Sequence, residues 1–192
     1  MKQSRGARTI VYPTPVFIVG TYDAEGKPNM MAAAWGGIAC SRPPAIRVAL
    51  RAATLTHGNI VARQAFTVSI ASEDDVAAAD YVGLVSGRDA DKFAQTGLTP
   101  VRSELVDAPY VAEFPMSVEC RLLHTLEIGL HTLFIGEVLD VKADEDVLNA
   151  EGKIDILKVR PLVFAPDGGG YYGIGDFLGP SFEIGRRIKD RA

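Results

Sequence analysis

Five polar residues lie close together between a predicted strand and a predicted helix: Arg51, Thr54, Thr56, His57 and Asn59. The strand is expected over Ala45–Leu50, after a proline pair, and the helix from Thr56 to Arg63. Free N–H groups at a helix start, hydroxyls and a guanidinium together bind anions such as phosphate. A simpler interpretation stays open, in which Thr56 only caps the helix and Arg51 is solvated.

A second candidate surface consists of residues at every other position: Asn29, Met31, Ala33 and Trp35. A strand is expected over Asn29–Ala34, and residues at spacing two share one face of a strand. Met31 and Ala33 alone would be ordinary core, but Asn29 and the single tryptophan add polar groups to that face. Such a face offers an apolar plane and donors to a flat ring. A flat ring with a phosphate tail describes flavin mononucleotide (FMN), so we expect these two features to bind FMN non-covalently.

Two further residues, Lys92 and His131, lie in or beside predicted turns. Lys92 belongs to the polar, glycine-containing loop Ser86–Phe93. A lysine there could stabilise the negative charge that reduction places on a flavin ring. His131 lies at a predicted hairpin bend, where a lone histidine is usually a surface residue. A solvated loop and a surface histidine therefore remain the alternatives.

The stretch Gly168–Gly173 fits the dinucleotide pattern G-x-G-x-x-G literally. That pattern requires a helix that opens at the glycines and an acidic residue about twenty positions further on. Gly175 and Pro180 interrupt any such helix, and too little chain remains for a βαβ unit. We interpret the stretch as a turn.

Histidines and cysteines give no strong motif. His124, Glu127 and His131 flank a predicted hairpin turn and lack a further partner at metal-ligand spacing, so no metal site is predicted. Cys40 and Cys120 do not form a CxxC motif. We expect both to be reduced, buried, structural thiols in a cytoplasmic protein.

The composition is that of a globular protein. The chain has 192 residues, of which 47% are hydrophobic, and a net charge of −4. A single domain over residues 1–192 is expected, burying roughly 70% of the surface that the unfolded chain exposes. There is no basic stripe for duplex nucleic acid, no continuous apolar core of a signal peptide, and no apolar run of the ~20 residues that a membrane helix requires.

The first half is predicted to mix strands and short helices. Val16–Tyr22 and the strand that starts at Asn29 form a hairpin around the turn Asp23–Lys27. A further strand is expected over Phe66–Ile70. Ser72 and, three residues on, an aspartate resemble a capping box that opens a helix over Glu73–Val82. One more helical turn is expected over residues 89–94.

The second half is predicted to be rich in strands. Met116–Ile128 and His131–Val141 form a long hairpin around Gly129, because apolar and polar residues alternate along them. Pro161–Phe164 and Tyr171–Gly173 suggest two short strands, and the tail from residue 181 a last helix. Many antiparallel strands with few short helices indicate a mainly β protein, built as a barrel.

At these residues the chain resembles the flavin reductase-like family, whose fold is an FMN-binding split β-barrel. The resemblance runs from about Thr9 to about Gly179. It rests on KPNMMAAAWGGIACSRPP, RAATLTHGN, LVSGRDADKF followed by GLTPVRS, and GLHTLFIGEV. It implies a homodimer with FMN near the subunit boundary. Many members have Asp before the histidine of the last motif, where this chain has Leu130.

The resemblance also implies a role for each candidate residue. Asn29 and Trp35 would contact the isoalloxazine, with the backbone at Met31 and Ala33 lining it. The phosphate would be held by Arg51, Thr54 and Thr56. Lys92 and His131 would approach the ring and ribityl side, with His131 the candidate catalytic residue, and Phe164 would pack nearby.

Three functions fit this resemblance. In the first, an enzyme oxidises NAD(P)H and passes electrons through FMN to an acceptor. In the second, a non-enzymatic carrier holds FMN permanently and moves electrons between protein partners. In the third, an FMN-binding module has no redox role.

Overall fold

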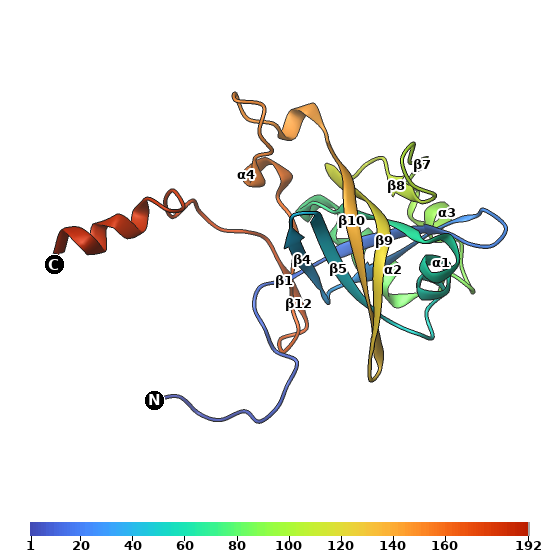
Figure 1. Ribbon diagram of the computed structural model, residues 1–192, viewed down its shortest axis with the longest axis horizontal. Coiled ribbons are helices and arrows are strands. Elements are labelled where there is room, and N and C mark those ends of the chain that lie inside the picture. Colours follow the sequence, from blue (N-terminus) through green and yellow to red (C-terminus); the bar gives the residue numbers. More distant parts are fainter. Residues whose placement is uncertain (192) are drawn as a thin grey trace.

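Seven antiparallel strands form one sheet that curls into a barrel (Figure 1). The computed structural model describes residues 1–191. The order across the sheet is β3-β2-β6-β9-β10-β5-β4. The strands are β2 Phe17–Tyr22, β3 Pro28–Ala33, β4 Gly36–Ser41, β5 Pro44–Arg51, β6 Ala65–Ile70, β9 Met116–Ile128 and β10 His131–Ala143. The two end strands, β3 and β4, are consecutive in the chain and are joined through Ala34 and Trp35, whose carbonyl accepts from the Ala49 N–H of β5 at 2.8 Å. The mainly β, split-barrel prediction is confirmed.

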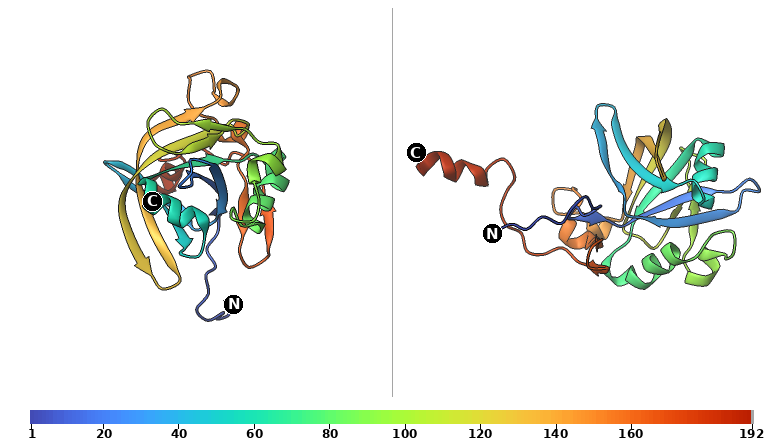
Figure 2. Two further views of the ribbon diagram at one scale, coloured as in Figure 1. Left: turned by 90° about the vertical axis from the view of Figure 1, so that its right-hand side faces the viewer. Right: turned by 90° about the horizontal axis from the view of Figure 1, so that it is seen from below.

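Smaller elements surround the barrel (Figure 2). One small sheet has the order β1-β11-β12, and β7 pairs with β8. Their bounds are β1 Thr14–Pro15, β7 Pro100–Arg102, β8 Pro109–Val111, β11 Val163–Ala165 and β12 Gly170–Tyr172. The α-helices are α1 Leu55–Arg63, α2 Val76–Leu84, α3 Lys92–Thr96 and α4 Ile156–Val159. Three 3₁₀ segments cover Glu73–Asp75, Glu145–Val147 and Ile184–Arg191.

Strand alternation divides the buried apolar residues into two clusters. The barrel interior is filled by one side of the strands, with Phe66 and Phe134 as its largest buried side chains. The other side of β2 and β3 carries Ile18 and Met30, which pack with Val82 of α2 in the second cluster. β3 lies between the two clusters. Its odd-numbered residues Met31 and Ala33 pack in the barrel interior, and its even-numbered residues Met30 and Ala32 pack in the second cluster.

Most predicted elements are observed within two residues. Both hairpins form, although β10 continues to Ala143. The capping box of Ser72 and Asp75 is present, but it opens a 3₁₀ turn before α2 begins. The tail contains a 3₁₀ helix from Ile184. The strands β1, β4, β7 and β8 were not predicted.

The N-cap of α1 lies two residues before the predicted one. Thr54, not Thr56, is the N-cap, and its Oγ1 accepts a hydrogen bond from the His57 N–H at 3.2 Å. Thr54 has the extended backbone that an N-cap requires, with φ −80° and ψ 148°. Thr56 is thereby free of capping and lies in the first turn.

Gly20 marks a place where two backbones touch. A Cβ at this position of β2 would overlap the carbonyl oxygen of Pro109, in β8. Gly58 in α1 has no neighbouring atom within 4 Å of an added Cβ. An added methyl group would therefore clash with backbone at position 20 and meet open space at position 58.

We expect Gly20→Ala to lower the free energy of unfolding by about 1–3 kcal/mol, because backbone must move to admit the methyl group. Gly58→Ala is the control and should raise stability by up to ~1 kcal/mol, since alanine is the better helix former. Urea denaturation measures both. Equal effects of the two substitutions would show that β2 and β8 are not in close contact.

Candidate functional site

A cavity of about 350 Å³, with a mainly apolar lining that also carries Arg51, two threonines and Lys92, opens beside the junction of β5 and α1. One wall is this junction, from Arg51 to Thr56. We call this the junction wall. The opposite wall, which we call the loop wall, is the end of α2 with the loop that follows it, residues 82–87. Met31 and Lys92 complete the lining. The cavity thus brings together three segments that are far apart in the sequence.

The junction wall is built to attract an anion. Arg51 ends β5 and is exposed, while Thr54 Oγ1 donates to the Arg51 carbonyl at 2.9 Å. The first turn of α1 contains no acidic residue. Its free N–H groups and the helix dipole therefore leave a positive potential at Thr54, Leu55 and Thr56, all of which line the cavity.

A buried hydrogen bond joins β3 to α1. Asn29 Nδ2 donates to Thr56 Oγ1 at 3.0 Å, and both side chains are buried. Gly87 packs directly on this pair, since a Cβ there would overlap Asn29 Oδ1 and lie 3.0 Å from Leu55 Cδ2. Arg88 Nη1 also donates to the Ala53 carbonyl at 2.7 Å. The loop wall is therefore fixed against the junction wall.

Lys92 supplies a second cation from within the wall. Its side chain is only 4% exposed, and Nζ donates to the Val82 carbonyl at 2.7 Å. Burial lowers the pKa of Lys92 from 10.5 to about 8. Among the ion pairs that the structure describes in residues 1–191, none involves Lys92. A charged amine with no carboxylate beside it favours an anionic ligand.

The residue before Lys92 holds this helix start in place. Asp91 caps α3 by accepting from the Ala94 N–H at 3.1 Å, and it pairs with Lys27 at 3.0 Å. Those contacts, the Ala94 amide first, lower the pKa of Asp91. Lys92 is thus the first residue of a capped helix.

A second, mainly apolar cavity of about 480 Å³ adjoins the first along β5. Its lining includes Trp35, Ala49, His131 and the N-terminal residues from Thr9 to Pro15. His131 pairs with Arg51 across β5 and β10. Arg51 lines the first cavity and Ala49 lines the second, and residues two apart share one face of a strand. The two cavities therefore form neighbouring parts of one surface.

The structure gathers most predicted site residues into these two cavities. Met31, Arg51, Thr54, Thr56 and Lys92 line the first, and Asn29 is bonded to Thr56. Trp35 and His131 line the second.

Four other residues of the sequence-based set lie elsewhere. Ala33 is buried in the barrel interior, and Phe164 packs on Tyr171 with ring centroids 5.7 Å apart. His57 Nε2 is 2.9 Å from Thr132 Oγ1, and Asn59 Nδ2 donates to a buried threonine at 3.0 Å. The last two side chains are thus held by interior threonines rather than by the cavity.

Sequence reasoning missed the wall formed by residues 82–86. Val82 was predicted as the last residue of a helix, and ligand contacts were sought only in the polar loop that starts at Ser86. A usable signal was the pair Gly83 and Gly87, since a Cβ on Gly83 would lie only 3.2 Å from Ala32 Cβ. Such close backbone approach is typical of glycine positions.

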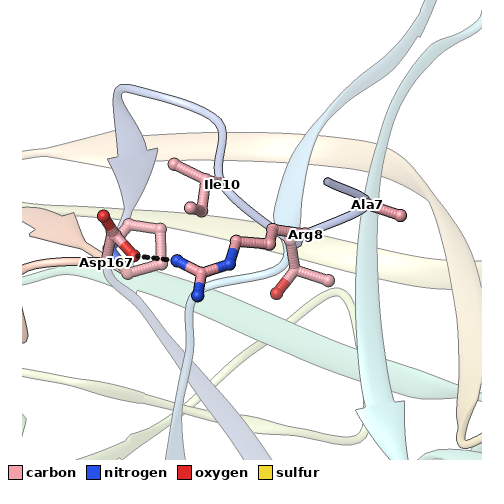
Figure 3. A pocket seen from close by; sticks show the side chains of 6 residues that line it. Ala7, Arg8, Ile10 and Asp167 are labelled. Carbon is pink, nitrogen blue, oxygen red and sulfur yellow. Dashed lines mark hydrogen bonds and ion pairs between the residues drawn. The ribbon is translucent and has the colours of Figure 1, made fainter. Parts of the chain in front are cut away.

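A third hollow lies between residues 7–10 and the β11–β12 turn. Across it Arg8 Nη1 and Asp167 Oδ1 point toward each other, 3.2 Å apart (Figure 3). Both side chains are exposed, so the pair contributes at most about 1 kcal/mol. The turn is the glycine-rich stretch of the rejected dinucleotide motif. The hollow offers no reactive group.

Within residues 1–191, no helix is long and apolar enough to cross a membrane. In the same range, no three His, Cys, Asp or Glu side chains are grouped so that they could hold a metal ion.

Comparison with known proteins identifies the family. Residues 8–174 match the flavin reductase like domain. Flavoredoxin of Desulfovibrio vulgaris (Miyazaki F) is 56% identical, with a TM-score of 0.93, over 96% of this chain and 100% of that one. Flavoredoxin from Methanosarcina acetivorans is 30% identical, with a TM-score of 0.88, over 98% of each chain. A high molecular weight rubredoxin of Moorella thermoacetica is 32% identical over 79% of this chain and 60% of its own length. The chain belongs to the flavin reductase-like family.

We expect the pKa of Lys92 to make stability depend on pH. Between pH 8 and 10.5 the unfolded chain binds the lysine proton more tightly than the folded chain does, so stability should rise with pH in this window. Relative to Lys92→Met, the flavin-free protein should gain at most about 1.4 kcal/mol for each pH unit. Urea denaturation of both proteins from pH 7 to 10.5 measures this. Parallel pH profiles of the two proteins would mean that folding does not lower the pKa of Lys92.

Proposed function

We propose that this protein binds FMN and passes electrons from NAD(P)H or a protein donor through the flavin to an acceptor. The observation that carries the proposal is the cavity of about 350 Å³, where Arg51, the start of α1 and buried Lys92 face one space. A cavity with two cationic side chains and a free helix start suits a ligand with a phosphate and a ring that becomes negative on reduction.

The residues fit each part of FMN. Arg51, Thr54 and Thr56 would hold the phosphate, with the helix start behind them. Met31 with the loop wall gives the ring an apolar surface, and Gly87 keeps that wall close to Asn29. The ring would extend toward the adjoining apolar cavity.

The other four assigned residues lie beside or behind the proposed position of the ring. Trp35 and His131 line the second cavity and would border the ring, with His131 the candidate catalytic residue where a donor approaches. The backbone at Ala33 continues the strand that carries Met31. Phe164 would act only through the apolar cluster beside α2, against which it packs.

The flavin would supply the electron chemistry itself. The chain's own residues bind and orient it, exclude water and place a charge. Lys92 is the residue that would place that charge, because it is protonated at neutral pH with a pKa of about 8. His131 places an imidazole ring at the border of the two cavities.

The proposal also covers the domain count, the oligomeric state and the compartment. We propose one domain over residues 1–192 and a homodimer, which would cover the exposed edge strand β4. Cys120 is buried as expected, but Cys40 is exposed on the edge strand β4, so the expectation that both cysteines are buried is wrong for Cys40. Both are free thiols, which supports the proposal of a reducing compartment such as the cytoplasm.

An alternative is a non-enzymatic electron carrier between protein partners. The names of two relatives favour it: flavoredoxin at 56% identity, and the rubredoxin, of which this chain matches only part. Stopped-flow mixing of the flavin-loaded protein with NADH and with NADPH separates the two. Rapid bleaching of the flavin absorbance supports the enzyme. No bleaching, together with rapid reduction by a reduced rubredoxin, supports the carrier.

We expect Arg51→Ala to weaken FMN binding by about 10- to 100-fold, because one charge-assisted hydrogen bond contributes on the order of 1.5–3 kcal/mol. Riboflavin, which lacks the phosphate, should bind the variant as it binds the wild type. Arg47→Ala is the matched control: Arg47 lies on the same face of β5 but lines the apolar cavity on the ring side, so its loss should change FMN and riboflavin binding by the same factor. Quenching of flavin fluorescence gives the dissociation constants. Equal losses of affinity for FMN and riboflavin would show that Arg51 does not bind the phosphate. Failure of the wild type to bind FMN would contradict the whole proposal.

We expect Lys92→Met to lower the reduction potential of bound FMN at pH 7. A cation beside the ring stabilises its reduced form by about 1 kcal/mol after screening, which is about 20 mV for a two-electron couple. The difference should shrink at pH 9.5, where Lys92 with a pKa of about 8 is mostly neutral. Lys153→Met, which removes an exposed lysine that does not line the cavity, should change the potential little. Identical potentials for wild type and Lys92→Met at pH 7 would place Lys92 away from the ring.

A further inference from the structure

The N-terminal segment of residues 7–13 forms one wall of the second, mainly apolar cavity. Three of its residues line that cavity: Thr9, Val11 and Pro13. The barrel supplies the facing wall, which includes Trp35 and His131. We call residues 7–13 the cover segment. It borders the space toward which the flavin ring is proposed to extend.

Few hydrogen bonds hold the cover segment in place. It contains no helix or strand, because β1 begins only at Thr14. In the part of the chain that the structure describes, one backbone group of residues 7–12 forms a hydrogen bond: the Val11 carbonyl accepts from Thr14 Oγ1 at 2.7 Å. That bond spans only three residues and holds the bend at which the segment leaves β1. Segments with so few hydrogen bonds open at a low cost in free energy.

Three hollows border the cover segment, so it also lacks close packing. The second cavity lies on one side, and the hollow toward Asp167 lies on another. A further hollow is lined by Tyr12 and by residues of β11 and β12. Val11 lines the second cavity and is still 74% exposed. The segment therefore has room to move without disturbing either buried cluster.

One ion pair tethers the far end of the cover segment. Arg8 Nη1 lies 3.2 Å from Asp167 Oδ1, in the turn between β11 and β12 (Figure 3). Among the ion pairs described for residues 1–191, no other involves the cover segment. The two side chains are 51% and 45% exposed, so the pair is weak and is screened by salt. At the near end the chain is fixed, because Thr14 is buried and pairs with Phe164 of β11.

We propose that the cover segment is a hinged cover over the second cavity, and that a flat ligand enters this cavity only after the Arg8–Asp167 pair breaks. The segment is fixed at β1 and weakly tethered at Arg8, so breaking one exposed contact releases it. That the ligand is the flavin ring rests on the function proposed above. The movement of the cover segment does not depend on a flavin.

Acrylamide quenching of tryptophan fluorescence tests the movement in the flavin-free, full-length protein. The single tryptophan, Trp35, lines the cavity opposite the cover segment, so the closed position shields it. We expect Arg8→Gln and Asp167→Asn each to raise the quenching constant about two- to five-fold, the range that one exposed ion pair supports. Added salt should raise the constant of the wild type but not that of Arg8→Gln.

Two further variants complete the quenching test. The charge exchange Arg8→Asp with Asp167→Arg should return the quenching constant to the wild-type value. Lys153→Gln is the matched control, because it breaks the exposed pair with Glu151 and does not touch the cavity. Wild-type quenching in both single variants, or an exchange variant that behaves like them, would overturn the proposal.

Stopped-flow binding of FMN tests whether the cover segment controls entry. A cover that the ligand must pass changes the association and dissociation rate constants by the same factor and leaves Kd unchanged. We expect Arg8→Gln to raise both rate constants about two- to five-fold and Lys153→Gln to change neither. Faster dissociation alone, with a weaker Kd, would show that the segment only contributes contacts and would overturn the proposal. A wild type that binds no FMN but shows the quenching changes would contradict the proposed function and leave the hinged cover supported.

Discussion

The hydrogen bond between Asn29 and Thr56 is the interaction on which the candidate site depends. It joins β3 to the first turn of α1 inside the protein, at 3.0 Å. Losing either partner would leave a buried polar group unpaired, at a cost of about 1–3 kcal/mol. Because Gly87 packs on the Asn29 carboxamide, the same bond sets where the loop wall lies. The cavity is therefore fixed by barrel packing rather than by its exposed residues.

This arrangement also explains how an acidic chain presents a positive site. The net charge is −4, yet Arg51, the start of α1 and Lys92 all face one cavity. Asp91, the nearest carboxylate in sequence to Lys92, is engaged by the Ala94 amide and Lys27. The field inside the cavity is thus set by local placement and not by net charge.

The sequence predicted the fold better than it predicted the details of the site. The long hairpin and the strands of the barrel follow from alternating patterns, which burial on one side enforces. β4 was not predicted because its two glycines and the prolines that follow it give no strand pattern, and because only its pairing with β5 holds it in the sheet. Neighbouring threonines could not be told apart by pattern, so the cap was assigned to Thr56 although backbone geometry selects Thr54. Whether Phe164 takes part in the site depends on tertiary packing that no local pattern records.

The central claim is that one flavin occupies the cavity between the β5–α1 junction and the loop wall. Amide hydrogen exchange of the protein with and without FMN tests it most directly, because each segment reports separately. The account predicts slower exchange at residues 54–57 and 83–92, with one FMN for each chain, and little change in the β7–β8 hairpin. Protection that is absent from both segments, or that is confined to other parts of the barrel, would contradict it.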